Sequence, residues 1–208
     1  MNIDVNMDYT KTMGEKIPFV TRLMDMLSGK LGSLYDFNVM VEFNENDALK
    51  NPANMKRIET LEQKLGTLQL TKISGDKPRV QSVTRLVKEM NRTLNADSTE
   101  YYKIPDAQDM LTQLLFLYEI SDADALFERM DEDYKTTYIH IELSGYDAKK
   151  IVEDLDSAKS YAAQIFPDAK TSIVGEVVNY AEMNGKLVNG LLRSFGGSFV
   201  IIAIMMIL

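Results

Sequence analysis

Four segments of the chain carry the hydrophobic pattern expected of β-strands. In residues 34–43 (LYDFNVMVEF), apolar side chains alternate with polar ones at a period of two, as in a strand with one buried face. Residues 136–143 (TTYIHIEL) repeat this alternation. Residues 170–175 and 79–83 are shorter candidates. The sequence therefore predicts four strands, of which the first and third have the clearest pattern.

The intervals between these strands show helical spacing. Pro52 fits the first turn of a helix, and apolar residues then recur at every third or fourth position as far as Gly66. Pro105 and Asp106 are expected to open another helix, and a short acidic helix is expected after Ser121. Further helices are predicted over residues 84–94 and 147–166, and from about residue 177 into the C-terminal residues.

The order of these elements predicts an α+β fold. Two βαβ units that share one mixed sheet form a ferredoxin-like βαββαβ sandwich, and a helical insertion over about residues 84–134 separates the second strand from the third. The helices after Pro52 and Asp147 are expected to pack on the same face of that sheet. Such a fold supports many functions and does not decide between them.

The C-terminal residues are strongly apolar. Residues 199–208 (FVIIAIMMIL) contain ten apolar residues in succession, whereas a helix needs ~20 to cross the ~30 Å of hydrocarbon in a bilayer. We expect residues 177–208 to form a helix that leads into a truncated transmembrane segment, with Phe199, Val200, Ile201 and Ile202 inserted in the membrane. The alternative is a final helix that is buried in a core or in a dimer interface.

The N-terminal residues point to the same arrangement. They are polar and acidic and lack the charged start and apolar core of a signal peptide. We expect residues 1–33 to be a linker that follows a missing membrane helix, and residues 34–176 to be a domain outside the cytoplasm.

Composition narrows the function classes. The chain has 208 residues, of which 45% are hydrophobic and 26% charged, so it can bury a real core. Its net charge of -8, with 23 basic residues scattered among 31 acidic ones, argues against binding to nucleic acid or to anionic lipid surfaces. The absence of cysteine excludes disulfides and thiolate metal sites.

One stretch carries a family resemblance. Residues 101–121 (YYKIPDAQDMLTQLLFLYEIS) combine paired tyrosines, a proline-initiated helix, and a glutamine before a leucine-rich run that ends in Tyr-Glu. This pattern resembles the large extracytoplasmic loop of resistance-nodulation-division (RND) exporters of the hydrophobe or amphiphile efflux type, relatives of the mycobacterial large membrane proteins and of Patched-like proteins. Weaker similarities lie at Gly29 with Gly32 and over residues 80–95, 130–143 and 194–208, so the resemblance covers nearly the whole chain.

The resemblance implies a porter domain of a proton-driven exporter in the cell membrane, with this domain on the extracytoplasmic side. Its partners would be the rest of the same transporter polypeptide, the membrane, and a hydrophobic or amphiphilic small molecule, with a homo-oligomer possible. No enzymatic activity and no cofactor are expected. The acidic residues that couple such exporters to protons lie within membrane helices.

The helix after Pro105 has apolar residues on more than one side, so some of them should border a cleft or a neighbouring domain. Phe116 and Tyr118, with Tyr101 and Tyr102, are the candidate substrate-binding residues. No catalytic or metal site is expected: the single histidine, His140, lies within a predicted strand without a nucleophile in view, and the acidic residues 119–133 lack calcium-loop spacing.

Two other functions stay open on the sequence. The chain could be a stand-alone ligand-binding or scaffold domain that dimerises through its apolar C-terminal helix. A soluble hydrolase is disfavoured because no nucleophile and base combination is recognisable.

Overall fold

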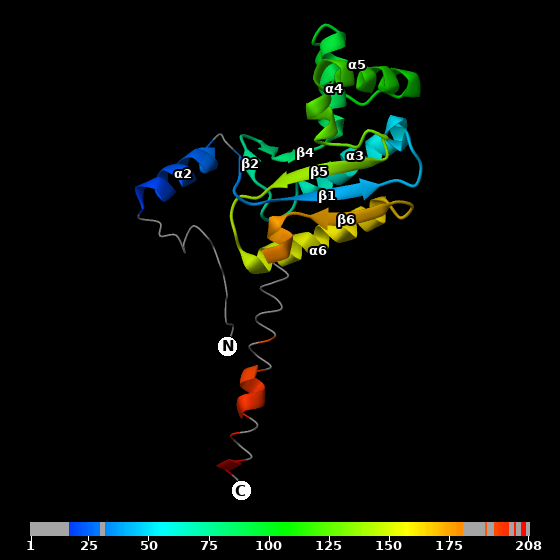
Figure 1. Ribbon diagram of the computed structural model, residues 1–208. Coiled ribbons are helices and arrows are strands. Elements are labelled where there is room, and N and C mark those ends of the chain that lie inside the picture. Colours follow the sequence, from blue (N-terminus) through cyan, green and yellow to red (C-terminus); the bar gives the residue numbers. More distant parts are fainter. Residues whose placement is uncertain are drawn as a thin grey trace.

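The structure is a computed structural model that describes residues 17–29 and 32–180, and residues 190, 194–199, 202, 205 and 206 near the C-terminus. Its elements are, in chain order, α2 (Pro18–Gly29), β1 (Asp36–Glu42), η1 (Ala48–Lys50), α3 (Pro52–Leu65), β2 (Ile73–Ser74), β3 (Lys77–Pro78), β4 (Val80–Gln81), α4 (Val83–Leu94), η2 (Thr99–Tyr101), α5 (Gln108–Phe127), β5 (Thr136–Glu142), α6 (Ala148–Ile165) and β6 (Lys170–Val174). Figure 1 shows their arrangement.

The four predicted strands lie in one sheet, in the order β4-β5-β1-β6. The α+β class is therefore confirmed, but the expectation of a mixed sheet is wrong, because every neighbouring pair is antiparallel. The reason lies in the crossovers. Helix α3 connects β1 to β4, and β5 lies between these two strands in the sheet. Helix α6 connects β5 to β6, and β1 lies between them. Parallel strands are thus never adjacent.

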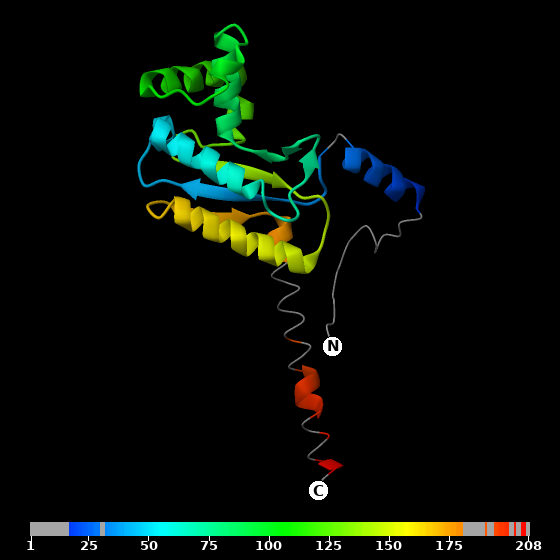
Figure 2. The same ribbon diagram turned by 180° about the vertical axis from the view of Figure 1, so that it is seen from behind.

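One face of the sheet is buried. Along β1, Phe37, Val39 and Val41 are buried and the residues between them are half-buried. The antiparallel register pairs Phe37 with Ile141 and Val39 with Ile139, so the buried residues of both strands share a face. Helices α3 and α6 lie side by side across this face, as Figure 2 shows, which confirms the prediction that both helices pack on the same side.

Helix α3 illustrates how local sequence sets an element. Asn51 caps its N-terminus by accepting a hydrogen bond from the Ala53 amide at 2.9 Å, and Pro52 occupies the first turn. At the other end, a Cβ placed on Gly66 would lie 2.9 Å from the Cγ atom of Pro78. Glycine therefore permits the β2–β3 hairpin, which was not predicted, to lie close against the end of α3.

Two further differences concern helices. Helix α2 lies within the segment predicted as a linker, residues 1–33, where no helix was predicted. Helix α5 begins at Gln108, after the predicted start at Pro105. The predicted division after Ser121 is confirmed, because the non-helical backbone angles of Asp122 (φ −159°, ψ 75°) separate α5 into two helical parts. The carboxylate of Asp122 accepts a hydrogen bond from the Ala125 amide at 3.2 Å, so this residue caps the second half of the helix.

The C-terminal residues are described only in part. Residues 194–199 are helical, and Figure 1 shows them (red) well separated from the sheet. The side chains of Phe195 and Phe199 are exposed. Within the described part of the chain, no helix combines the length and the apolar character needed to cross a membrane. Ile202 is described and exposed, whereas Val200 and Ile201 lie outside the described residues, so the membrane segment stays a prediction.

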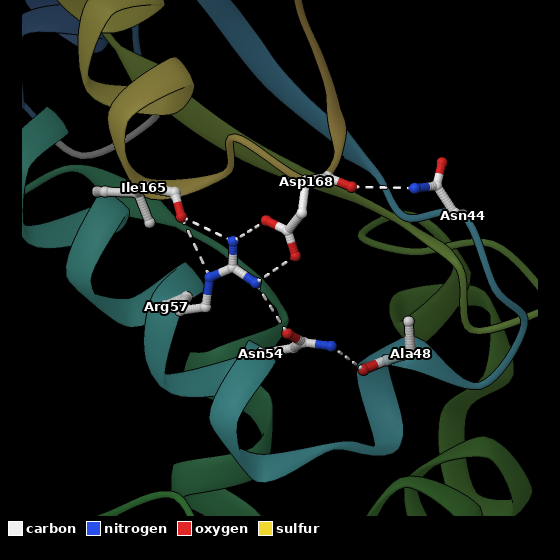
Figure 3. A network of polar contacts seen from close by, with 6 residues as sticks. All are labelled: Asn44, Ala48, Asn54, Arg57, Ile165 and Asp168. Carbon is white, nitrogen blue, oxygen red and sulfur yellow. Dashed lines mark hydrogen bonds and ion pairs between the residues drawn. The ribbon is translucent and has the colours of Figure 1, made fainter.

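A polar network joins α3 to the turn between α6 and β6 (Figure 3). Arg57 donates two hydrogen bonds to the Ile165 carbonyl, at 3.1 and 2.7 Å, and pairs through two nitrogens with the carboxylate of Asp168. Its guanidinium lies 4.5 Å from the centroid of the Phe166 ring. The hydrogen bonds from Arg57 lower the pKa of Asp168 below its usual range. Arg57 thus connects the two helices that cover the sheet.

We expect Arg57→Ala to lower the free energy of unfolding by about 2 kcal/mol, because hydrogen bonds from a charged donor are worth about 1.5–3 kcal/mol. The exposed pair with Asp168 contributes less than the bonds to the Ile165 carbonyl. The matched control is Lys56→Ala on the same helix, whose pair with Asp106 is exposed. Urea unfolding at pH 7 measures both variants, and equal losses would contradict this role of Arg57.

The stability difference between wild type and Arg57→Ala should depend on pH. The pKa of Asp168 is lowered in the folded state. The contribution of the Asp168 carboxylate to the free energy of unfolding is therefore present above the ordinary aspartate pKa and is lost as pH falls through the lowered pKa. The difference between wild type and Arg57→Ala should therefore narrow in strong acid.

Candidate functional site: the helical insertion

The helical insertion, defined here as residues 83–127 between β4 and β5, projects beyond the β4 edge of the sheet (Figures 1 and 2). It contains α4, η2 and α5. Its buried side chains belong to the same hydrophobic core as the sheet, so the insertion is attached to the rest of the fold by apolar packing. The buried aliphatic side chains are Val83, Val87, Ile104, Leu111, Leu114, Leu115 and Leu126.

Buried hydroxyl groups fix the start of α4 against α3. Ser82 caps α4 by accepting a hydrogen bond from the Thr84 amide. The hydroxyls of Ser82 and Thr84 both donate to the carboxylate of Glu62 on α3, at 2.7 and 2.5 Å. Both hydroxyl residues are fully buried, so the carboxylate satisfies polar groups that would otherwise be costly to bury. The position of α4 relative to α3 is therefore set by polar as well as apolar contacts.

A cleft of about 510 Å³ lies between α3 and α4. Ion pairs cross it and border it: Lys88 of α4 contacts Glu59 of α3 at 2.7 Å, and Arg92 contacts Glu89 at 2.8 Å. The cleft is lined by Glu59, Glu62, Gln63, Lys77, Pro78, Val80, Arg85, Lys88, Glu89, Arg92, Thr99 and Tyr102. Its volume falls in the range of small-molecule sites, about 300–1,000 Å³.

Of the predicted site residues, Tyr102 lines this cleft. The ammonium of Lys88 lies 5.3 Å from its ring centroid, and the guanidinium of Arg92 lies 5.8 Å away. These distances are typical of cation–π contacts. Tyr101 is exposed, and its ring is 5.8 Å from the ammonium of Lys103.

The other two predicted residues lie on opposite sides of α5. Tyr118 points toward α4, where it borders a small apolar gap together with Leu86 and Leu114. Burial, and secondarily the charge of Asp122, raise the pKa of Tyr118. Phe116 points outward and is 58% exposed. The prediction that the apolar residues of this helix cannot all face one side is confirmed.

Phe116 belongs to an apolar surface. Leu117 and Ile120 are also exposed, and Ile120 lies one helical turn from Phe116. We call these three residues the α5 outer patch. Large exposed apolar side chains that adjoin one another mark interaction sites more often than single ones do.

The four predicted residues therefore do not form one pocket. Tyr102 lines the cleft, Tyr118 borders a small apolar gap between α4 and α5, and Phe116 belongs to the α5 outer patch. The sequence interpretation missed the cleft, because its charged residues looked like solvated helix faces. One signal was present: Arg85, Lys88 and Arg92 follow at spacings of three and four, which places them on one side of α4.

The acidic residues near α5 serve local structure. Glu119 accepts a hydrogen bond from the hydroxyl of Tyr134, and Asp131 accepts bonds from the amides of Lys135 and Thr136, at 2.7 and 2.9 Å. Burial and the bond to Glu119 raise the pKa of Tyr134. On β5, His140 forms a hydrogen bond with Asn38 of the neighbouring strand at 3.1 Å. Across residues 17–29, 32–180 and the described C-terminal positions, no group of three or more metal-ligating side chains converges.

No protein-family model matches the sequence, and a search of curated proteins finds no match.

Alanine substitutions at two adjacent residues of α5 should have different effects on the free energy of unfolding. Leu115 is 1% exposed and lies in the core, so Leu115→Ala should lower the free energy of unfolding by about 2–5 kcal/mol. Phe116→Ala should change it by no more than about 0.5 kcal/mol, as for most surface positions. Urea unfolding of the two variants checks this, and a large loss for Phe116→Ala would assign that residue to core packing.

Proposed function

We propose that this chain is an extracytoplasmic, porter-type domain of a proton-driven RND exporter of hydrophobic or amphiphilic molecules. The observation that carries the proposal is the location of the α5 outer patch. Phe116, Leu117 and Ile120 are exposed, and they lie within residues 101–121, the same stretch that resembles the exporter family. A segment selected only for core packing would have no need of this outward face.

The fold supports the proposal at a coarser level. The sheet contains two strand-helix-strand units, and in each unit one strand of the other unit lies between the two strands: β5 lies between β1 and β4, and β1 lies between β5 and β6. We interpret this order as a ferredoxin-like sandwich with a helical insertion between its second and third strands. Such a fold is compatible with a porter domain but is shared by many proteins of other function.

The chemistry of the α5 outer patch fits passage or docking of apolar groups. Covering a large aliphatic or aromatic side chain is favourable by about 1.5–3 kcal/mol relative to full exposure. The patch is therefore a favourable contact for a lipophilic cargo molecule, or for a neighbouring domain of the same polypeptide that encloses the cargo path. No bond is made or broken in this role, and the domain acts without enzymatic activity.

In this proposal the exposed side chains of Phe195 and Phe199 belong to the approach of the chain to the membrane. The acidic residues that couple export to protons would be in membrane helices of the full-length transporter. The domain would contribute the outer part of the cargo path, on the extracytoplasmic side of the cell membrane.

The test is a charge on the α5 outer patch. In cells that produce the full-length protein, Phe116→Asp should reduce efflux of the lipophilic dye Nile red by about tenfold or more, because desolvating a carboxylate costs more than the ~1.4 kcal/mol that equals a factor of ten. Abundance of the protein should stay normal, since Phe116 lies outside the core.

The matched control is Val152→Asp, which adds the same charge at an exposed apolar position of α6. It should leave efflux unchanged. Full efflux by Phe116→Asp at normal abundance, or no Nile red efflux by the wild-type protein, would contradict the proposal.

A further inference from the structure

Two cations that line the cleft between α3 and α4 have no hydrogen-bond or ion-pair partner among the described residues. Each of its three glutamates is already engaged: Glu59 with Lys88, Glu89 with Arg92, and Glu62 with the buried hydroxyls of α4. The side chains of Lys77 and Arg85 form no hydrogen bond or ion pair with any residue in the described part of the chain. The lining carries four cationic side chains against three carboxylates, because the hydroxyl bonds to Glu62 leave its negative charge in place, so the cleft has an excess of one positive charge in a chain whose net charge is -8.

The same cleft offers apolar surface beside these charges. Pro78, the buried side chain of Val80 and the ring of Tyr102 form part of its lining. Lys88 and Arg92 lie near the Tyr102 ring and hold positive charge close to it. An occupant that satisfies both kinds of surface needs a negative group and an apolar body.

We propose that this cleft binds a small amphiphilic anion, in which a carboxylate, sulfonate or phosphate group is joined to an apolar body. Lys77 and Arg85 would bind the anionic group, and the apolar body would lie against Pro78 and Tyr102. Arginine suits this role because its planar guanidinium presents several donors to an oxyanion. The cleft volume of about 510 Å³ accommodates a molecule of one or two rings with such a group.

The contacts that join the walls of the cleft support the assignment. Its α4 wall is fixed to α3 by the Ser82 and Thr84 bonds to Glu62 and by the pair between Lys88 and Glu59. A preformed site avoids the ordering cost that a flexible site would add to binding. Binding in this cleft requires only this chain and is independent of the proposed role in export.

The probe for the test is naphthalene-2-sulfonate, titrated into the full 208-residue chain and followed by isothermal titration calorimetry. Saturable binding with one molecule per chain is expected. Arg85→Gln and Lys77→Gln should each weaken binding about threefold to fivefold, as for exposed charge pairs, and the double variant about tenfold. Raising the salt concentration should weaken binding further.

Three controls separate this site from non-specific apolar binding. Lys149→Gln, at an exposed lysine of α6 outside the cleft, should leave the affinity unchanged. Tyr102→Ala should weaken the binding of naphthalene-2-sulfonate. It should leave the binding of inorganic sulfate, a much weaker ligand, unchanged. The neutral analogue 2-naphthol should bind about tenfold more weakly than the sulfonate, because it lacks the charge that Arg85 and Lys77 bind.

Each contrary result overturns the proposal. Absence of saturable binding removes the site. Equal affinity of wild type and the double variant, or of 2-naphthol and the sulfonate, shows that the cations do not bind the ligand. Because all four substituted side chains lie at the surface, thermal unfolding of each variant should match wild type, and this measurement excludes loss of the fold as a cause.

Discussion

The structure depends on one constraint, the one-sided burial of its antiparallel sheet. Phe37, Val39 and Val41 reach the helix-covered face only if β1 keeps its register with β5 and β6. A slip of one residue would turn this set to the open face and bring Asn38 and Met40 into the core. The register therefore fixes where α3 and α6 pack, and Arg57 then connects these helices through the Ile165 carbonyl and Asp168.

The position of the helical insertion follows from α3. Glu62 of α3 is half-buried and binds the hydroxyls of Ser82 and Thr84 at the start of α4. Leu114 and Leu115 then bring α5 onto the shared core. With these contacts made, two surfaces remain outside the core: the charged cleft between α3 and α4, and the α5 outer patch. They lie on different elements and differ in chemistry, so they are suited to different ligands.

The strands and main helices could be predicted because their patterns are local. Alternation along residues 36–42 and the spacing of Met55, Ile58 and Leu61 need no knowledge of distant residues. Sheet order, by contrast, depends on pairing between residues about a hundred positions apart, such as Asn38 with His140. The β2–β3 hairpin has two residues in each strand, too few to show a period.

The candidate site was predictable only in part. The sequence of α5 has apolar residues on more than one side of the helix, so an exposed apolar face at Phe116 could be expected. The cleft could not be predicted, because it forms where polar faces of α3 and α4 meet. Each face alone has the pattern of an ordinary solvated helix surface.

The location of this domain relative to the membrane is the most direct test of the exporter proposal. The chain contains no cysteine, so Ser160→Cys at an exposed position of α6 introduces a single reporter in this domain of the full-length protein, with any cysteine elsewhere replaced. Ala158→Cys, at a position that is 0% exposed, serves as the buried control. A membrane-impermeant maleimide added to intact cells should label the Ser160→Cys protein and leave the Ala158→Cys protein unlabelled. Labelling of Ser160→Cys only after the cells are lysed would place the domain inside the cell and would contradict the proposal.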